Sequence, residues 1–496
     1  MGDGGCKDNK YKRDIKLLRA DVERDPGNAR AHFYLANSYK DTGEWEAAAR
    51  HYRKRIDIGG WYEEVWYSHY NLGKCLRALG RMPEATAAWL EGYNFYPGRM
   101  ENLYEIVKHY RENGKNELAY KFYEWAKAIP KPTADNLFIH HDIYDYALDY
   151  EYTVFYYYLK DRARLPGRRI HALTYAMLRH GHHVPNVLSN YKFYAQELAA
   201  LPGARAVRVA APALGGDFEP STPALVAAPG GRLLANVRHN NTGLTSDMKS
   251  YTQRGDREVT RNQWAYVDRD GAVSEAGEMS ENTAYPDRND LFAGRQDVRL
   301  LRAGARLLYT ATVCAEHGGA RRLCMEHGEY DLTTKRLRGT VIPSPRNAEC
   351  EKNWCLFEHE GAVRCLYGWS PIVVGALEDG RFVEQERWAT PGECRVMRGS
   401  TPGAWRGGEL WFGVHLVSYE APRHYYHALV AVDPARRAVL RMTYPFKLEG
   451  VPIEYVCSLD FPDEHTVRLA YSLADARPSW LEVPAGALQW HTPAPP

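Results

Sequence analysis

Small and bulky apolar residues recur at a fixed spacing in the first part of the chain. The pattern occurs in three copies. The first has Leu35, Ala36, Tyr39, Gly43, Ala48 and Tyr52, the second has Leu72, Gly73, Leu76, Gly80, Ala85 and Trp89, and the third has Ile106, Val107, Tyr110, Gly114, Ala119 and Tyr123. Within a copy the apolar positions follow the three-to-four spacing of a helix, and the glycine falls where the chain must turn. The pattern therefore predicts pairs of antiparallel helices.

A period of about 34 residues is typical of helix pairs that stack into a solenoid. Prolines at positions 26, 97 and 130 follow the predicted second helices, and residues 11–25 supply a partial unit before the first copy. These features together resemble the tetratricopeptide repeat family. The resemblance implies an α-solenoid over residues 1–135 that binds a protein partner or an acceptor.

Helical periodicity continues without the repeat from about residue 136 to residue 200. Aromatic and apolar residues keep a three-to-four spacing through IYDYALDYEYTVFYYYL and HALTYAMLRHGHHVPNVLSNYKFY. We expect two or three capping or linking helices, and we assign residues 136–205 to them.

After Pro202 the pattern changes to short alternating runs separated by Gly, Pro, Asp and Asn. Regular strand and turn spacing without helices between the strands is typical of an all-β domain. About five strand clusters start near residues 230, 297, 351, 398 and 454, which favours a five-bladed propeller over residues 206–496; a sandwich is the alternative. The sequence thus predicts an α + β multidomain protein, with an N-terminal α-solenoid and a C-terminal all-β propeller.

Composition excludes several classes of partner. The 64 Lys and Arg residues nearly balance the 62 Asp and Glu residues, so no bulk field attracts nucleic acid. We expect no membrane span and a cytoplasmic protein, because the longest apolar run is short and the N-terminus lacks a signal-peptide core. Neither a nucleotide-binding glycine loop nor a metal-ligand pattern is present, so we predict no cofactor and no metal site.

Polar clusters stand at or near the starts of the predicted strand groups. Inner strands of a propeller and their loops converge on one end of the central channel, so residues about 50 apart in sequence can meet there. The candidate binding residues are Asn236, Arg238, Arg299, Lys352, Asn353, Arg398, Ser400, His415, Tyr426, His427, Glu449 and Glu454, with Asp297 as the candidate catalytic residue. Carboxylates can bind sugar hydroxyls and transfer protons, and arginines suit phosphate.

The β-rich part resembles the propeller superfamily of β-mannoside phosphorylases and related mannosyltransferases. The matching residues are Asn236, Gln296-Asp297-Val298-Arg299, His415, and Tyr426 with Val432-Asp433. The resemblance implies that Asp297 is the general acid and that arginines and histidine hold phosphate. Gln296 and Val298 stand where that family has an acidic residue and a proline, and a transferase fits these changes as well as a phosphorylase.

The whole arrangement is also similar to glycosyltransferase-like proteins of large DNA viruses and bacteria. This resemblance rests on Asn236-Val237-Arg238, Asp297-Val298-Arg299, Glu351-Lys352-Asn353-Trp354, Arg398-Gly399-Ser400 and the run HLVSYEAPRHYYH. It implies tetratricopeptide repeats joined to a sugar-transferring domain.

We therefore expect a glycosyltransferase that acts on mannose-like sugars, uses a phosphate-bearing donor and glycosylates a glycan acceptor. An inverting glycoside phosphorylase is the first alternative. The second is a non-catalytic protein-binding or glycan-binding scaffold, in which Asp297 and Arg299 only brace neighbouring blades.

Overall fold

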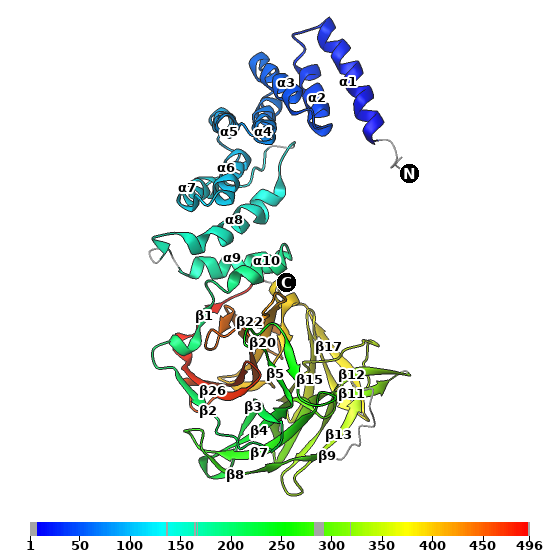
Figure 1. Cartoon of the computed structure of the whole chain (residues 1–496), viewed down its shortest axis with the longest axis vertical. Helices are drawn as coiled ribbons and strands as arrows, with labels where there is room; N and C mark the ends of the chain where they lie inside the picture. Colours follow the sequence, from blue (N-terminus) through cyan, green and yellow to red (C-terminus); the bar gives the residue numbers. More distant parts are fainter. Residues whose placement is uncertain are drawn as a thin grey trace. The chain divides into compact units, whose positions relative to one another are not determined.

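The computed structural model describes residues 7–134, 137–162, 165, 167–281, 292–317 and 319–494. The chain divides into two compact units, Met1–Ile170 and His171–Pro496, and Figure 1 colours them along the sequence. Among the described helices, none has the length and apolar character that crossing a bilayer requires. The limits 1–135, 136–205 and 206–496 stay a prediction.

The first unit is built from helices. They are α1 (Lys7–Arg24), α2 (Ala29–Asp41), α3 (Trp45–Ile58), α4 (Tyr62–Ala78), α5 (Met82–Phe95), α6 (Glu101–Glu112), α7 (Asn116–Lys127), the π-helix η1 (Ile143–Ala147), α8 (Leu148–Phe155) and the 3₁₀ turn η2 (Tyr156–Tyr158). The pairs α2/α3, α4/α5 and α6/α7 carry the three copies of the sequence pattern. The predicted helical array is confirmed.

Two glycines show why the repeat needs small residues. Gly80 lies in the turn between α4 and α5 with φ 75°, a conformation that most other residues avoid. A Cβ atom at Gly73 would lie 2.2 Å from the Trp89 ring nitrogen, so the glycine lets α4 and α5 approach closely. The Trp89 ring nitrogen donates to the Tyr70 carbonyl at 3.1 Å, which satisfies the buried indole.

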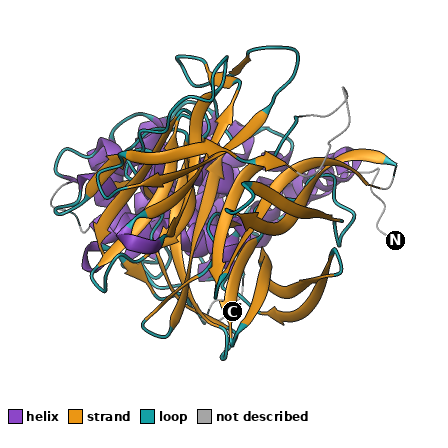
Figure 2. Ribbon diagram, turned by 90° about the horizontal axis from the view of Figure 1, so that it is seen from below, coloured by secondary structure: helices purple, strands orange, loops and turns teal. Residues whose placement is uncertain are grey.

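The second unit is dominated by antiparallel sheets, drawn in orange in Figure 2. Four of them are β3 (Glu219–Ala227), β4 (Leu233–Asn240), β7 (Thr260–Val267) and β8 (Val273–Glu278); β10 (Gln296–Ala303), β11 (Arg306–His317), β12 (Ala320–Asp331) and β13 (Arg336–Ile342), with β9 (Ser280–Glu281) at the edge; β14 (Cys355–His359), β15 (Ala362–Trp369), β16 (Ile372–Glu378) and β17 (Arg381–Trp388); and β2 (Arg205–Arg208), β26 (Arg477–Pro484), β25 (Thr466–Leu473) and β24 (Glu454–Asp460). Strand β2 joins the last sheet and so closes the ring of sheets.

A further sheet of eight strands is branched. It contains β1 (Gln196–Glu197), β18 (Arg398–Gly399), β19 (Ala404–Arg406), β20 (Glu409–Ser418), β21 (His424–Asp433), β22 (Ala438–Thr443), β23 (Phe446–Lys447) and β27 (Trp490–His491). Strand β21 pairs with both β22 and β23, and β1 pairs with β23 in parallel. A two-stranded sheet, β5 (Thr242–Leu244) with β6 (Tyr251–Gln253), is separate.

The arrangement of the described sheets is propeller-like, but the prediction of five blades is wrong. Four sheets have the simple meander of a blade, whereas the eight-stranded sheet branches. The physical reason is that the strand after β21 is interrupted, so β22 and β23 share its edge. The later strand β27 then adds to β22, and the earlier strand β1 adds to β23. Alternating apolar residues look the same in a regular and in a branched sheet, which is why the sequence pattern did not distinguish them.

Buried residues fill the space between neighbouring sheets. Leu234 of β4, Leu300 of β10 and Tyr330 of β12 belong to one apolar cluster, and Val237 of β4 packs with Trp480 of β26 in another. Sheet faces thus cover each other in sequence order, and their inner strands are brought to a common region.

Helix α10 (Val184–Tyr191) and residues 171–180 of α9 (Gly167–His180) belong to the second unit. The Tyr175 hydroxyl donates to the Thr443 carbonyl at 2.5 Å, and the Tyr191 hydroxyl donates to the Pro445 carbonyl at 2.8 Å. Arg179 pairs with the fully buried Glu393 at 2.6 Å. These contacts attach both segments to the eight-stranded sheet and to the turn before β18.

Candidate functional site

A cavity of about 430 Å³ collects residues from the inner strands and from the loops beside them. We call it the Asp297 cavity. Its lining side chains are Arg238, Thr242, Tyr251, Thr252, Gln253, Glu258, Gln296, Asp297, Lys352, Arg423, Tyr425, Ile453, Tyr455 and Asp475. Every large sheet contributes a strand or an adjoining loop, so this is the region in which the strand starts converge.

Asp297 occupies an irregular position at the start of β10. Gln296 pairs with Thr312 and Arg299 pairs with Thr310, so the ladder is interrupted between them by a bulge. Asp297 has φ 54°, in the left-handed region that few non-glycine residues adopt. Bulges and such backbone conformations often serve to aim a side chain. Here the carboxylate, 17% exposed, lines the cavity.

Arg238 on β4 is the immediate partner of Asp297. Its Nη1 donates to Asp297 Oδ1 at 3.1 Å, and its Nη2 lies 3.8 Å from Glu258 Oε1. Burial acts to lower the pKa of Arg238, but the carboxylates of Asp297, Asp475 and Glu258 outweigh it and raise that pKa. Gln296 donates to Glu258 at 2.5 Å. Two carboxylates thus face one buried guanidinium.

Arg299 on β10, the second arginine of the candidate set, is fully buried and its guanidinium is hydrogen-bonded on several sides. It donates to the Ser400 carbonyl at 2.7 Å, to Asn353 Oδ1 at 3.0 Å and to the Tyr455 hydroxyl at 2.6 Å. The Tyr455 hydroxyl in turn donates to Asn353 Oδ1 at 3.1 Å. Arg299 therefore ties three strand starts together beneath the cavity, and its geometry is that of a positioning residue.

Ser400 and His415 contact the residues that surround Arg299. The Ser400 hydroxyl and His415 Nδ1 are 2.8 Å apart, and the His415 ring lies edge-on to the Tyr455 ring at 5.3 Å. Burial lowers the pKa of His415 well below its usual value, and the cations of Arg299 and Arg398 act in the same direction. The imidazole is therefore neutral, and its ring packs against the Tyr455 ring.

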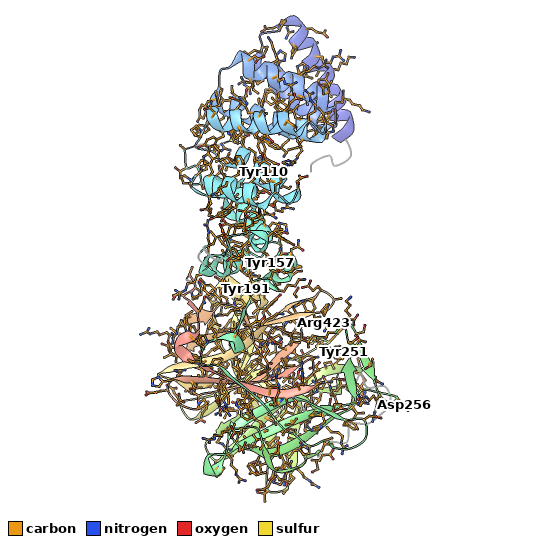
Figure 3. The ribbon with its side chains drawn as sticks, turned by 60° about the vertical axis from the view of Figure 1, so that its left-hand side comes forward. Tyr110, Tyr157, Tyr191, Tyr251, Asp256 and Arg423 are labelled. Carbon is orange, nitrogen blue, oxygen red and sulfur yellow. The ribbon has the colours of Figure 1, made fainter. Side chains whose placement is uncertain are left out.

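Lys352 and Arg423 bring positive charge to the wall of the Asp297 cavity. Both side chains are exposed, and neither pairs with a carboxylate within the described part of the chain. Arg423 and Tyr251, labelled in Figure 3, line the same cavity. The Tyr251 hydroxyl donates to Asp475 Oδ2 at 2.7 Å. The cavity thus offers free cations beside carboxylates and tyrosine rings.

Ten of the twelve predicted binding residues do not line the Asp297 cavity. Arg299, Asn353, Ser400 and His415 form the hydrogen-bonded group described above, Arg398 lines two other cavities, and the remaining five serve the fold. Asn236 is buried between Asn262 and Tyr330, and the Tyr426 hydroxyl donates to the Leu188 carbonyl at 2.8 Å. His427 contacts the Glu454 carbonyl at 3.1 Å, and burial lowers its pKa to about 4.

The two predicted glutamates of the last strand group also serve the fold. Glu454 accepts backbone hydrogen bonds from Leu448 and Glu449 at 2.7 Å each. Glu449 pairs with Arg208 at 2.6 Å and accepts from the Tyr471 hydroxyl. Arg398 lines two neighbouring cavities and stacks on Tyr419 at 5.6 Å.

Sequence reasoning missed two carboxylates of the cavity, Glu258 and Asp475. Glu258 follows the hairpin of β5 and β6, outside the predicted strand starts. Asp475 lies in the turn between β25 and β26 with φ 49°, where an aspartate is an ordinary turn residue. Only the position of that hairpin turn, at the end of its sheet where β24 starts, could have indicated it.

No cluster suited to a metal ion occurs among the described His, Cys, Asp and Glu side chains. The run His180-Gly181-His182-His183 forms the turn between α9 and α10, with Gly181 at φ 74° and His183 at φ 51°. That backbone is a connecting turn in the second unit.

The chain matches no family model and no curated protein. Among solved structures it is similar to a GDP-Man-dependent mannosyltransferase from Leishmania mexicana, with 10% identity and TM-score 0.38 over 58% of this chain and 94% of that one. It is similar to a mannose phosphorylase from Leishmania mexicana, with 11% identity and TM-score 0.37 over 61% of this chain and 93% of that one. It is also similar to YrrB, a TPR protein with an unusual peptide-binding site, with 15% identity and TM-score 0.27 over 37% of this chain and 84% of that one. Likenesses this weak do not bear on activity, and the resemblance to viral and bacterial proteins stays a prediction.

Proposed function

We propose that the second unit is a carbohydrate-active enzyme that transfers a mannose-like glycosyl group from a phosphate-bearing donor to a hydroxyl of a glycan acceptor. The observation that carries the proposal is the Asp297 cavity itself. In this cavity Asp297 accepts a hydrogen bond from the buried guanidinium of Arg238. Lys352 and Arg423 line the same cavity, and among the described residues neither of them pairs with a carboxylate. A proton acceptor and phosphate-binding cations are the two functions that the transfer needs.

The proton chemistry follows from the position of Asp297. The acceptor oxygen attacks the anomeric carbon while the bond from that carbon to the phosphate oxygen breaks. The bonding electron pair leaves with the phosphate, and the proton of the acceptor hydroxyl passes to the Asp297 carboxylate. Arg238 holds that carboxylate at 3.1 Å and so fixes its orientation.

Charge on the departing phosphate is the second requirement. Lys352 and Arg423 both line the cavity and can contact that phosphate, and charge-assisted hydrogen bonds from such cations are the strong ones. Tyr251, Tyr425 and Tyr455 offer ring faces and hydroxyls to the sugar. Glu258 and Asp475 add acceptors for sugar hydroxyls.

An inverting glycoside phosphorylase is the second candidate. The same cations could hold inorganic phosphate, and the same Asp297, once protonated, could protonate the glycosidic oxygen while phosphate attacks the anomeric carbon. The bulge at Asp297 would aim the side chain in either reaction, whereas the ion pair with Arg238 favours the ionised carboxylate and therefore the transferase. The candidates differ in whether a sugar 1-phosphate suffices as donor.

For the helical repeats we propose binding of a protein partner or of the acceptor. Large aromatic side chains are exposed there, with Tyr34 at 42%, Trp61 at 45% and Tyr62 at 43%. Exposed aromatic side chains are common anchors at interfaces.

The test is a panel of sugar 1-phosphates and nucleotide sugars, first by thermal shift and then by product formation with manno-oligosaccharide acceptors. We expect a donor to raise the melting temperature, since a ligand that binds the native state stabilises it. Asp297→Asn should retain the shift and lose turnover, whereas Asp256→Asn, at the exposed position labelled in Figure 3, should keep both. A chain that binds no donor and forms no product would be a scaffold.

A further inference from the structure

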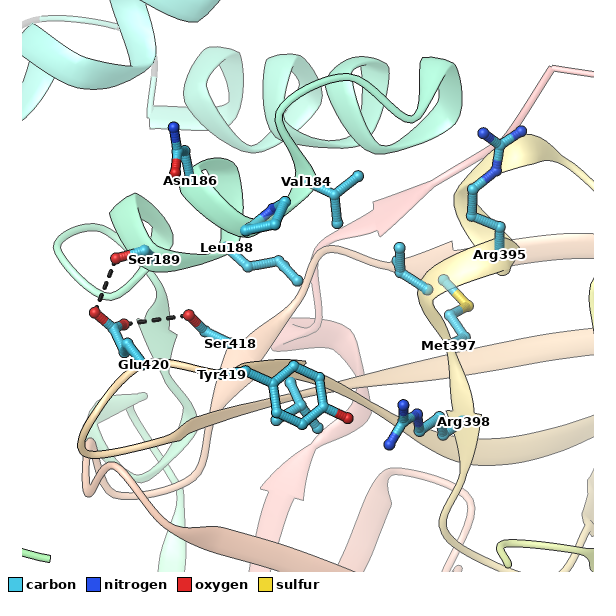
Figure 4. A pocket seen from close by; sticks show the side chains of 13 residues that line it. Val184, Asn186, Leu188, Ser189, Arg395, Met397, Arg398, Ser418, Tyr419 and Glu420 are labelled. Carbon is cyan, nitrogen blue, oxygen red and sulfur yellow. Dashed lines mark hydrogen bonds between the residues drawn. The ribbon is translucent and has the colours of Figure 1, made fainter. Parts of the chain in front are cut away.

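A cavity of about 490 Å³ lies between α10 and the edge formed by β18 and β20, within the second unit. We call it the apolar cavity. Aliphatic side chains from three segments line it: Val184 and Leu188 of α10, Val396 and Met397 before β18, and Val417 of β20 (Figure 4). Its volume is in the range of small-molecule sites, and its lining suits a group with little polarity.

A third cavity, of about 440 Å³, borders both the apolar cavity and the Asp297 cavity. We call it the middle cavity. It shares Met397 and Arg398 with the apolar cavity and Lys352 with the Asp297 cavity. The three cavities therefore form one row, whose two junctions each carry a cation.

The two carboxylates that line the middle and apolar cavities are already engaged. Glu351 accepts from Ser344 at 2.5 Å and from the Trp354 ring nitrogen at 3.1 Å. Glu420 accepts from Ser189 at 2.8 Å (Figure 4). It also accepts from Lys192 at 2.6 Å. Neither carboxylate is left to neutralise a cation of the row.

The cations of the same row lack such partners. Across the described residues, none of the side chains Arg346, Lys352, Arg395 and Arg398 pairs with a carboxylate. Arg346 and Arg398 instead stack on the rings of Tyr367 at 4.8 Å and Tyr419 at 5.6 Å. Stacking of this kind leaves the guanidinium edge available for hydrogen bonds. The free charge of the middle and apolar cavities is therefore positive, and it lies beside the aliphatic lining of the apolar cavity.

We propose that this row binds the leaving group of the donor as a diphosphate that carries a bulky, largely apolar group. The inference rests on the proposed function and specifies its donor. The sugar would lie at Asp297, the phosphates at Lys352, Arg346 and Arg398, and the bulky group in the apolar cavity. Two sources share this chemistry, a nucleoside diphosphate and an isoprenyl diphosphate.

The experiment measures binding by calorimetry with the full chain and no acceptor. The probes are GDP, UDP, ADP, geranyl diphosphate and inorganic pyrophosphate. We expect at least one organic diphosphate to bind about tenfold or more tightly than pyrophosphate, because burial of its apolar group adds free energy that pyrophosphate lacks. The organic probe that binds identifies the source. If none binds more tightly than pyrophosphate, the proposal is overturned.

Two substitutions separate the charged from the apolar contribution. Arg398→Gln should weaken organic diphosphates and pyrophosphate alike, by about tenfold, through loss of a charge-assisted contact. Val396→Trp should fill part of the apolar cavity and weaken the organic probe alone. Arg381→Gln, on the exposed β17, is the matched control and should change neither affinity. Unchanged affinities in Val396→Trp and in a second cavity-filling variant, Val184→Trp, would contradict the proposal, provided that both keep the wild-type melting temperature.

Failure of this inference can be told apart from failure of the proposed function. Turnover of a sugar 1-phosphate that depends on Asp297, without binding of any organic diphosphate, would overturn the inference alone. Binding of an organic diphosphate without turnover of any donor would overturn the proposed function and leave the binding site standing.

Discussion

Arg238 on β4 donates a 3.1 Å hydrogen bond to Asp297 on β10, so two neighbouring sheets meet through one ion pair at the wall of a cavity. Glu258 lies 3.8 Å from the same guanidinium. The pair thus contributes both to the packing of the sheets and to the chemistry proposed for the cavity. Its contribution to stability and its contribution to turnover can be tested separately.

Loss of the guanidinium should destabilise the second unit. Arg238→Met leaves Asp297 and Glu258 facing each other without a cation, and we expect the free energy of unfolding to fall by about 1.5–3 kcal/mol, the usual contribution of a hydrogen bond to a charged group. Urea denaturation measures it. The control is Arg436→Met, which removes an exposed pair with Asp433 and should cost about 0–1 kcal/mol. Equal losses of unfolding free energy in the two variants would show that the Arg238 pair stabilises the protein no more than an exposed ion pair does.

The backbone at Asp297 makes a separate prediction. Because φ is 54° there, Asp297→Gly and Asp297→Asn add no backbone strain and should lose only what the pair with Arg238 contributes. Asp297→Val should lose about 1–3 kcal/mol more than the glycine variant, since a β-branched residue is strained in that region. Thermal unfolding of the three variants tests this. A valine variant as stable as the glycine variant would mean that the bulge does not constrain this position.

Glu393 gives the protein an acid-sensitive contact. Burial acts to raise its pKa, but the His491 ring and the Arg179 guanidinium outweigh burial and lower the pKa to about 2. A carboxyl whose pKa is lower in the folded than in the unfolded state stabilises the protein above its unfolded pKa. That stability should be lost as the pH falls from about 4.5 towards 2.

The matched variant for this prediction is Glu393→Gln. It should be less stable than the wild type at pH 7, and the difference should shrink between pH 4.5 and pH 3. Urea unfolding at the three pH values is the measurement. A difference that stays constant with pH would mean that Glu393 contributes by packing alone.

Lys352 should affect donor binding more than folding. Lys352→Gln removes an exposed cation at the junction of the Asp297 and middle cavities, so we expect KM for the donor to rise about tenfold with little change in melting temperature. Steady-state kinetics with the best donor of the panel measure it, with Arg381→Gln as a charge-matched control on β17. An unchanged KM would remove Lys352 from the donor site.

Part of this site could be predicted from the sequence because strand starts converge in a propeller-like fold. Arg238, Asp297 and Lys352 stand at or beside inner strands, and all three line one cavity. Glu449 and Glu454 stand near a strand start as well, yet one pairs with Arg208 and the other binds backbone amides. Residue type and strand position do not tell which way a side chain points once a loop folds back.

Other features lay beyond any local pattern. Asp475 looks like an ordinary turn residue, and its place in the cavity depends on how the β25–β26 hairpin meets Tyr251. The branching of the eight-stranded sheet depends on pairing between β21 and the short β23. Strand β23 has two residues, which are too few to produce a recognisable alternating pattern in the sequence. The helical repeats were easier, because their period and small residues are local signals repeated along the chain.

The most direct test of the central claim is turnover by Asp297→Asn. Product formation should be followed with the donor that gives the largest thermal shift, in wild type, Asp297→Asn and the exposed control Asp256→Asn. The proposal predicts that Asp297→Asn binds the donor, stays folded at the assay temperature and is about 10²- to 10⁴-fold slower, the usual contribution of a general acid or base. Wild-type turnover in Asp297→Asn would contradict it.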